Sequence, residues 1–246
     1  MTISERTVHA APPIVDRDQW LREREALLVR EKAYTREGDA LAAARRRLPM
    51  TEVELPTLTD DSGRVSLLDV FGDRDQLVVY KHMWHAGQPF EGQCEGCTFS
   101  IWNFQRAEDA AYLAEKGIGF AVFCDGPWAE VAPFRDFMGY TQPWYSTHGS
   151  TDTVWNTDGT ITCLVRRGDS VYLTYESTSR GVETMMPSLR LLDLTAFGRQ
   201  EQWEDSPEGW PQDPPYQFWR RDGRPTGQWT RPGVGAVPAA AEHHHH

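Results

Sequence analysis

The chain has 246 residues, of which 39% are hydrophobic and 11% aromatic, and its formal net charge is −11 at pH 7. This size supports one hydrophobic core of roughly 150–200 residues plus extensions. The acidic balance argues against nucleic acids and anionic membrane surfaces as partners, because both attract basic faces. No apolar run reaches the ~18 residues that a membrane span needs, and the N-terminus lacks the apolar segment of a signal peptide. We therefore expect a cytoplasmic protein.

Residues 1–48 predict an arm followed by a long helix. Asp16 is a candidate N-cap, and the segment after it is rich in Arg, Glu, Ala and Leu up to Arg47. Apolar residues recur along this segment at helical spacing, namely Trp20, Leu27, Leu28, Tyr34 and Leu41. One stripe of the helix should therefore be buried against the domain or a second subunit, and we expect a homodimer through it.

Residues 49–199 alternate between strand and helix patterns and predict a single domain. Strands are expected over 53–58, 77–80, 119–124, 161–165 and 171–175, helices over 100–116, 128–138 and 182–192, and a loop over 139–159. Parallel crossovers followed by an antiparallel hairpin give an α/β fold, a thioredoxin-like mixed sheet flanked by helices. Residues 200–241 are rich in Trp and Pro and predict a loop-rich extension, and 242–246 resemble an expression tag.

A Cys-x-x-Cys, Cys94 and Cys97, stands where the apolar strand 77–80 hands over to a helix. In a cytosolic chain this motif is more often redox-active or metal-binding than part of a structural disulfide framework. Cys94 is the candidate nucleophile, because the unpaired amides and dipole of a helix N-terminus favour its thiolate. Cys97 would resolve a mixed disulfide. Glu95 opposes ionisation of Cys94, so we expect only a modest lowering of its pKa.

Further side chains are candidates for binding substrate or supporting the two cysteines. His82 and His85 would offset the charge of Glu95 if they fold back over the pair. Trp84 and Trp144, expected on loops, would line a substrate groove. The set is completed by Arg180, which would hold an anionic substrate unless it forms a surface ion pair, and by Thr160 at the start of the closing hairpin.

Two alternatives concern the remaining ligand-type residues. His82, His85, Cys94 and Cys97 are four ligands of the type that zinc prefers, although residues three apart in a strand lie on opposite faces. Cys124 and Cys163 are expected at strand ends near the pair, as an electron relay or as small buried residues. We expect no cofactor besides the redox-active disulfide, with zinc as the minority alternative.

Several stretches resemble a bacterial family catalogued as domain of unknown function 899, described as predicted dithiol–disulfide oxidoreductases with a thioredoxin-like core. The resemblance runs from about Trp20 to Arg199. It is carried by segments 20–28, 63–71, 76–80, 91–99, 180–181 and 192–195. Thioredoxins place a cis-proline before the closing hairpin, whereas Thr160 and Ile161 stand there in this chain. This departure resembles the peroxiredoxin-like branch.

Together these features favour an enzyme, a thiol–disulfide oxidoreductase that uses the Cys-x-x-Cys pair and is open to a peroxiredoxin-like variant. Its expected partner is a protein or small-molecule thiol, disulfide or peroxide, without nucleic acid or membrane. The alternative is a non-catalytic thioredoxin-like module that binds zinc or assembles subunits.

Overall fold

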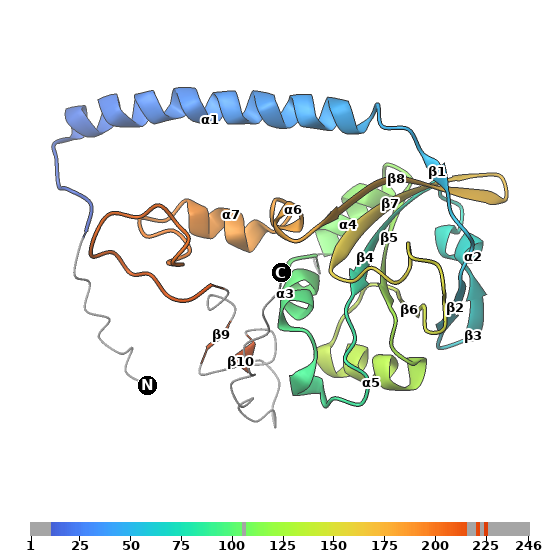
Figure 1. The fold of residues 1–246 in the computed structure, drawn as a ribbon. Coiled ribbons are helices and arrows are strands. Elements are labelled where there is room, and N and C mark those ends of the chain that lie inside the picture. Colours follow the sequence, from blue (N-terminus) through green and yellow to red (C-terminus); the bar gives the residue numbers. More distant parts are fainter. Residues whose placement is uncertain (1–10, 105–106, 216–219, 222–223, 226–246) are drawn as a thin grey trace.

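The computed structural model describes residues 11–104, 107–215, 220–221 and 224–225. The predicted tag and the start of the N-terminal arm lie outside these residues. The long helix α1 (Arg17–Arg45) runs along one side of the molecule, away from the sheet (Figure 1). Asp16 caps it, since its carboxylate accepts a hydrogen bond from the Gln19 N–H at 2.8 Å. None of the 29 residues of α1 is buried, so the chain alone does not cover the expected stripe.

An eight-stranded mixed sheet forms the centre of the molecule, in the order β1-β8-β7-β4-β5-β6-β2-β3. Strands β4, β5 and β6 run parallel, and β7 and β8 add an antiparallel hairpin on the other side of β4. The strands are β1 (Thr51–Glu52), β2 (Thr57–Asp60), β3 (Gly63–Ser66), β4 (Gln76–His82), β5 (Ile118–Cys124), β6 (Trp144–Ser146), β7 (Thr160–Arg167) and β8 (Ser170–Thr178).

Helices cover both faces of this sheet (Figure 1). The helices that follow α1 are α2 (Leu67–Phe71), η1 (Phe90–Gly92), α3 (Glu95–Phe104), α4 (Ala107–Ala114), α5 (Trp128–Met138), α6 (Arg180–Glu183) and α7 (Pro187–Asp193). The strands β9 (Arg220–Arg221) and β10 (Arg224–Pro225) form a separate ladder. Neighbours along β4 alternate between two apolar cores, because successive side chains of a strand point to opposite faces. Tyr80 joins the core with α3 and α5, whereas Val79 joins the core with α2.

Apart from the short strand β6, which follows α5, the element order β4, α3–α4, β5, α5, β7, β8, α6–α7 is the thioredoxin-like arrangement, which confirms the predicted fold class. The helix predicted over 128–138 has those bounds. The helix predicted over 100–116 begins earlier, at Glu95, and is divided into α3 and α4. The expected loop over 139–159 contains β6, and the single helix expected over 182–192 is two helices, because Pro187 begins α7.

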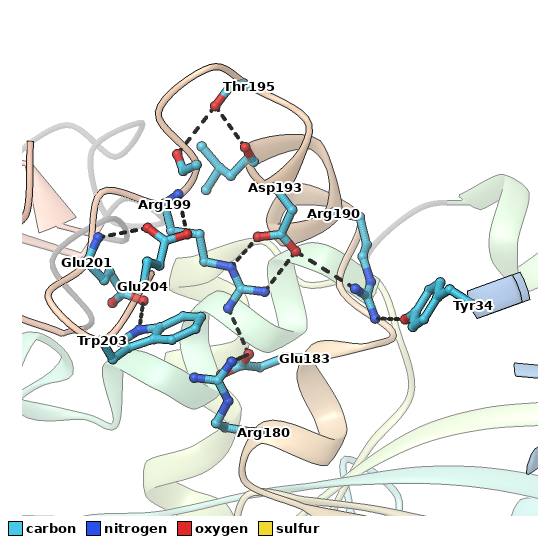
Figure 2. Close-up of polar contacts among 12 residues, drawn as sticks. Tyr34, Arg180, Glu183, Arg190, Asp193, Thr195, Arg199, Glu201, Trp203 and Glu204 are labelled. Atoms are coloured by element: carbon cyan, nitrogen blue, oxygen red, sulfur yellow. Dashed lines mark hydrogen bonds and ion pairs between the residues drawn. The ribbon is translucent and has the colours of Figure 1, made fainter. Parts of the chain in front are cut away.

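The start of the C-terminal extension is fixed to the domain by the buried Arg199 (Figure 2). Its Nε and Nη2 donate to the two oxygens of Asp193 at 2.7 and 3.1 Å, and its Nη1 donates to Glu183 at 2.7 Å. Arg190 of α7 in turn donates to the Tyr34 hydroxyl of α1 at 3.1 Å. Within the described residues, no helix combines the length and apolarity needed to cross a membrane.

Candidate functional site

Cys94 is the residue just before α3, at the end of the connection that leads from β4 to this helix. Its carbonyl accepts hydrogen bonds from the Thr98 N–H at 3.0 Å and the Thr98 hydroxyl at 2.9 Å, which fix the first turn. The Cys97 N–H donates to Cys94 Sγ at 3.4 Å, so the sulfur serves as acceptor for an otherwise unpaired amide. Cys94 is half-buried, whereas Cys97 is 3% exposed, and both are thiols in this structure.

The two thiols differ in their tendency to ionise. A hydrogen bond from the Cys97 side chain lowers the pKa of Cys94, helped by the backbone N–H groups of Cys97 and Gly96 and opposed by burial and the charge of Asp158. The same side-chain hydrogen bond raises the pKa of Cys97 well above its usual value, and burial adds to this effect. The pair is therefore polarised, with the thiolate favoured on the more accessible sulfur.

Strand β4 supplies the surroundings of the inner sulfur. The Met83 N–H, one residue past β4, donates to Cys97 Sγ at 3.4 Å. The side chain of Tyr80 also forms a hydrogen bond with Cys97, and burial followed by the nearby Cys97 charge raises the Tyr80 pKa well above its usual value. Cys97 is thus enclosed by groups that can donate to a thiolate while keeping water away.

The connection between β4 and α3 is anchored at several points. The Trp84 indole donates to Glu130 Oε2 of α5 at 3.0 Å, and the Gly87 N–H reaches the same oxygen at 3.3 Å. The Gln93 side chain accepts from the His85 N–H and donates to the His85 carbonyl, both at 3.0 Å. A Cβ at Gly126 would lie 2.4 Å from the Trp84 ring, so glycine is required for this close approach.

Charged groups gather at the same edge of the sheet. Asp125 directly follows β5, and the Gly159 N–H donates to the Lys81 carbonyl at 2.8 Å, which holds Asp158 beside the end of β4. Burial, and then repulsion by Asp125, raises the pKa of Asp158 to about 6. The sequence reasoning missed both carboxylates as site residues. Their only signal was position, since Asp125 directly follows one predicted strand and Asp158 precedes another by three residues.

The two predicted histidines have different surroundings. His82 is fully buried, with its ring 5.7 Å from that of Phe134 and 5.3 Å from that of Trp144. Burial lowers its pKa to about 4, so it is neutral near pH 7 and cannot offset the charge of Glu95 as predicted. His85 is half-buried, with Nδ1 3.0 Å from the Gly92 carbonyl. Among the residues that the structure describes, no three His, Cys, Asp or Glu side chains gather as a metal site.

The other predicted residues have these positions. Trp84 and Trp144 are 8% and 2% exposed, and Trp144 lies in β6 rather than on a loop, so both pack in the core. Thr160 is buried, and its hydroxyl donates to the Thr157 carbonyl at 3.1 Å. Glu95, the first residue of α3, is half-buried.

Arg180 lies in the polar cluster around Arg199 (Figure 2). Its guanidinium carbon lies 3.9 Å from the centre of the Trp203 ring, and its Nη2 pairs with Glu183 at 3.7 Å. This is the surface ion pair that was its alternative role.

Cys124 and Cys163 lie on strands next to β4. Cys124 ends β5 opposite His82, as expected. Cys163 does not start its strand but lies three residues into β7, opposite Val78. Burial raises the pKa of both thiols. Both are therefore weaker nucleophiles than Cys94 at neutral pH.

Comparison with known proteins gives a family and, among the solved structures, remote likenesses that include the two described below. A family model described as "Bacterial protein of unknown function (DUF899)" matches residues 9–224. No curated protein matches the chain. The crystal structure of peroxidoxin BcpB from Mycobacterium tuberculosis has 17% identity and a TM-score of 0.37, covering 56% of this chain and 87% of its own. The solution structure of a putative thioredoxin from Neisseria meningitidis has 13% identity and a TM-score of 0.32, covering 64% of this chain and 97% of its own.

Proposed function

This chain belongs to the bacterial family DUF899, and we propose that it is a thiol–disulfide oxidoreductase in which Cys94 attacks and Cys97 resolves. One observation supports this most strongly: the Cys97 N–H donates to Cys94 Sγ at 3.4 Å, at the start of a helix and one turn from a second thiol. This arrangement lowers the pKa of the outer sulfur and raises that of the inner one. A nucleophile and its resolving partner need this difference.

The reaction proceeds in two exchanges. The Cys94 thiolate attacks one sulfur of a substrate disulfide, forms a mixed disulfide and expels the other sulfur as a thiolate, which takes a proton from water. Cys97 then loses its proton and attacks Cys94 Sγ, which closes the Cys94–Cys97 disulfide and releases the second substrate thiol. Two electrons pass from the protein to the substrate, and an external thiol reductant returns them.

A hydroperoxide is the second candidate substrate, because the same pair can process it. The Cys94 thiolate would attack the peroxide oxygen, become a sulfenic acid and release an alcohol or water. Cys97 would then condense with the sulfenic acid, forming the same disulfide and a further water. This variant uses the same two sulfurs and differs only in the first electrophile.

Replacing Cys94 with Ser tests the proposal. Reduction of insulin by dithiothreitol and consumption of hydrogen peroxide should both fall to the rate without protein, whereas Cys163→Ser should keep the wild-type rates. Titration with Ellman's reagent should find two more thiols in wild-type protein after reduction than after oxidation. Equal rates for wild type and Cys94→Ser in both assays would refute the proposal and favour the non-catalytic module.

A further inference from the structure

The charges around Cys94 bear on which disulfides it attacks, and this inference rests on the proposed function. Cys94 lies at the edge of the sheet where the parallel strands β4 and β5 end. Asp125 directly follows β5, and Asp158 precedes β7 by two residues. Because β5 and β7 are the two neighbours of β4, the two carboxylates flank the strand end from which the chain leads to Cys94.

Asp158 is fixed in this position by the backbone. The Gly159 N–H donates to the Lys81 carbonyl at 2.8 Å, and the Thr160 hydroxyl donates to the Thr157 carbonyl at 3.1 Å. These bonds hold the residues on both sides of Asp158. Two hydrogen bonds, from the Met83 N–H to Cys97 Sγ and from the Cys97 N–H to Cys94 Sγ, both at 3.4 Å, place the outer sulfur at the same end of β4. In keeping with this placement, the charge of Asp158 opposes ionisation of Cys94. Asp158 is therefore a carboxylate that backbone hydrogen bonds on both sides hold at the end of the sheet where Cys94 lies.

The lysine at this edge does not present its charge to an incoming molecule. Lys81 is 2% exposed, and its Nζ donates to Glu176 Oε2 at 2.8 Å and to the Val154 carbonyl at 2.7 Å. The Thr162 hydroxyl donates to the same Glu176 oxygen at 3.1 Å. The ammonium is thus neutralised inside the protein, which leaves Asp125 and Asp158, with Glu95 next to Cys94, as negative charges at this edge.

Two oxygens at the same edge lack well-formed hydrogen bonds within the described part of the chain. These are Asp125 Oδ1 and the hydroxyl oxygen of Thr147, a residue that is 1% exposed. The Thr147 N–H donates to the Cys124 carbonyl at 2.8 Å, so Thr147 lies next to the point where Asp125 leaves β5. Both oxygens are buried, so they add negative potential at this edge of the sheet without contacting an incoming molecule directly.

We propose that Asp158 and Asp125 make Cys94 selective for disulfides that carry a positively charged group next to the sulfur. An aminoalkyl disulfide, or a peptide cysteine flanked by Lys or Arg, has this chemistry. The exchange itself is unchanged: Cys94 takes one substrate sulfur into a mixed disulfide, Cys97 displaces it, and two electrons reduce the substrate to two thiols. The carboxylates act before bond formation, by raising the local concentration of cations and lowering that of anions.

The test uses three small disulfides of different charge on the reduced full-length protein. Cystamine is cationic, hydroxyethyl disulfide is neutral and dithiodipropionate is anionic. The rate at which each disulfide consumes protein thiols is measured at low ionic strength. It is divided by the rate at which the same disulfide reacts with free dithiothreitol, which removes differences in the intrinsic reactivity of the three disulfides. We expect cystamine to react fastest and dithiodipropionate slowest, with the spread shrinking at high salt.

Two variants that each remove one negative charge test whether the selectivity depends on the position of that charge. Asp158→Asn should reduce the ratio of the cystamine rate to the dithiodipropionate rate about threefold to tenfold, and leave the hydroxyethyl disulfide rate within about twofold. Asp169→Asn alters the turn between β7 and β8, at the opposite end of these strands, and should change the ratio less than twofold. An equal ratio in wild type and Asp158→Asn would overturn the inference while leaving the proposed function intact. Absence of reaction with all three disulfides would instead refute the proposed function.

Discussion

The backbone N–H of Met83 and the sulfur of Cys97 form a hydrogen bond of 3.4 Å that links the end of β4 to the first turn of α3. The donor comes from the strand, so it does not depend on the helix that carries both cysteines. A thiolate formed at Cys97 would find this donor already in place, because backbone amides do not need to reorganise. In the proposed reaction, the sheet would thereby support the second exchange, in which the buried sulfur must ionise.

Replacing Cys97 with Ser should stop the reaction after the first exchange. Cys94 can still attack a disulfide, but no thiol one turn away can displace the substrate, so the mixed disulfide should accumulate. Intact-protein mass spectrometry should show one substrate adduct per chain, and turnover should fall by more than about tenfold. The double variant Cys94→Ser, Cys97→Ser is the control and should carry no adduct. Undiminished turnover in Cys97→Ser would assign resolution to another group.

His82 should make the protein sensitive to acid. Burial lowers its pKa to about 4 in the folded chain, whereas an unfolded histidine titrates near 6.5. The folded state therefore has its full stability above about pH 6.5 and loses it as the pH falls toward 4. Relative to His82→Phe, wild type should lose about 2 kcal/mol of unfolding free energy between about pH 7 and pH 5.

Urea unfolding of both proteins at the two pH values measures this difference. Asp158 acts in the opposite direction, because its raised pKa disfavours the folded state as pH rises through about 6. It is present in both proteins, so the comparison isolates His82. Identical pH dependence in wild type and His82→Phe would show that His82 does not resist protonation in the fold.

Gly126→Ala should destabilise the connection before Cys94. The added Cβ would lie 2.4 Å from the Trp84 ring, which is anchored to Glu130 and has little room to move. We expect a loss of about 1–3 kcal/mol in unfolding free energy, measured by urea titration. Gly38→Ala in α1 is the matched control: its Cβ meets no atom within 4 Å, and it should stabilise the helix by about 0.5–1 kcal/mol. Equal effects at both positions would contradict the tight contact.

Arg199→Met should release the C-terminal extension from α6 and α7. The substitution leaves the carboxylates of Asp193 and Glu183 without their main partner, and losses of about 3 kcal/mol are typical when one member of a largely buried pair is removed. Arg180→Met, which removes an exposed charge from the same cluster, should cost less than about 1 kcal/mol. Thermal or urea unfolding compares them. Similar losses for both variants would show that the Arg199 contacts contribute little.

The homodimer expected through α1 stays a prediction. Trp20, Leu27 and Leu41 repeat at multiples of seven residues and are each 45–49% exposed. Arg and Glu alternate over 22–25 and again at 36–37, so an antiparallel second copy could pair opposite charges. Light scattering should give about twice the 28.1 kDa chain mass, and Leu27→Asp should give the single mass. A wild-type monomer at high concentration would remove the dimer.

The features that depend on local pattern were predictable from the sequence. The apolar run that forms β4, the Cys-x-x-Cys beside it and the helix over 128–138 each follow from spacing within one short segment. The pairing of Asp125 with Asp158 was not, because 33 positions separate them in the chain and only the sheet order brings them together. The burial of His82 was missed for a similar reason: it is enclosed by rings from α5 and β6, which no local pattern around His82 reveals.

The unequal ionisation of the four sulfurs has a practical consequence. Cys94 has a lowered pKa, whereas those of Cys97, Cys124 and Cys163 are raised. A maleimide dye offered briefly at neutral pH should attach at a single point without mutagenesis. Since that point vanishes when the two neighbouring sulfurs join, the extent of labelling of the purified protein would report the fraction that is reduced.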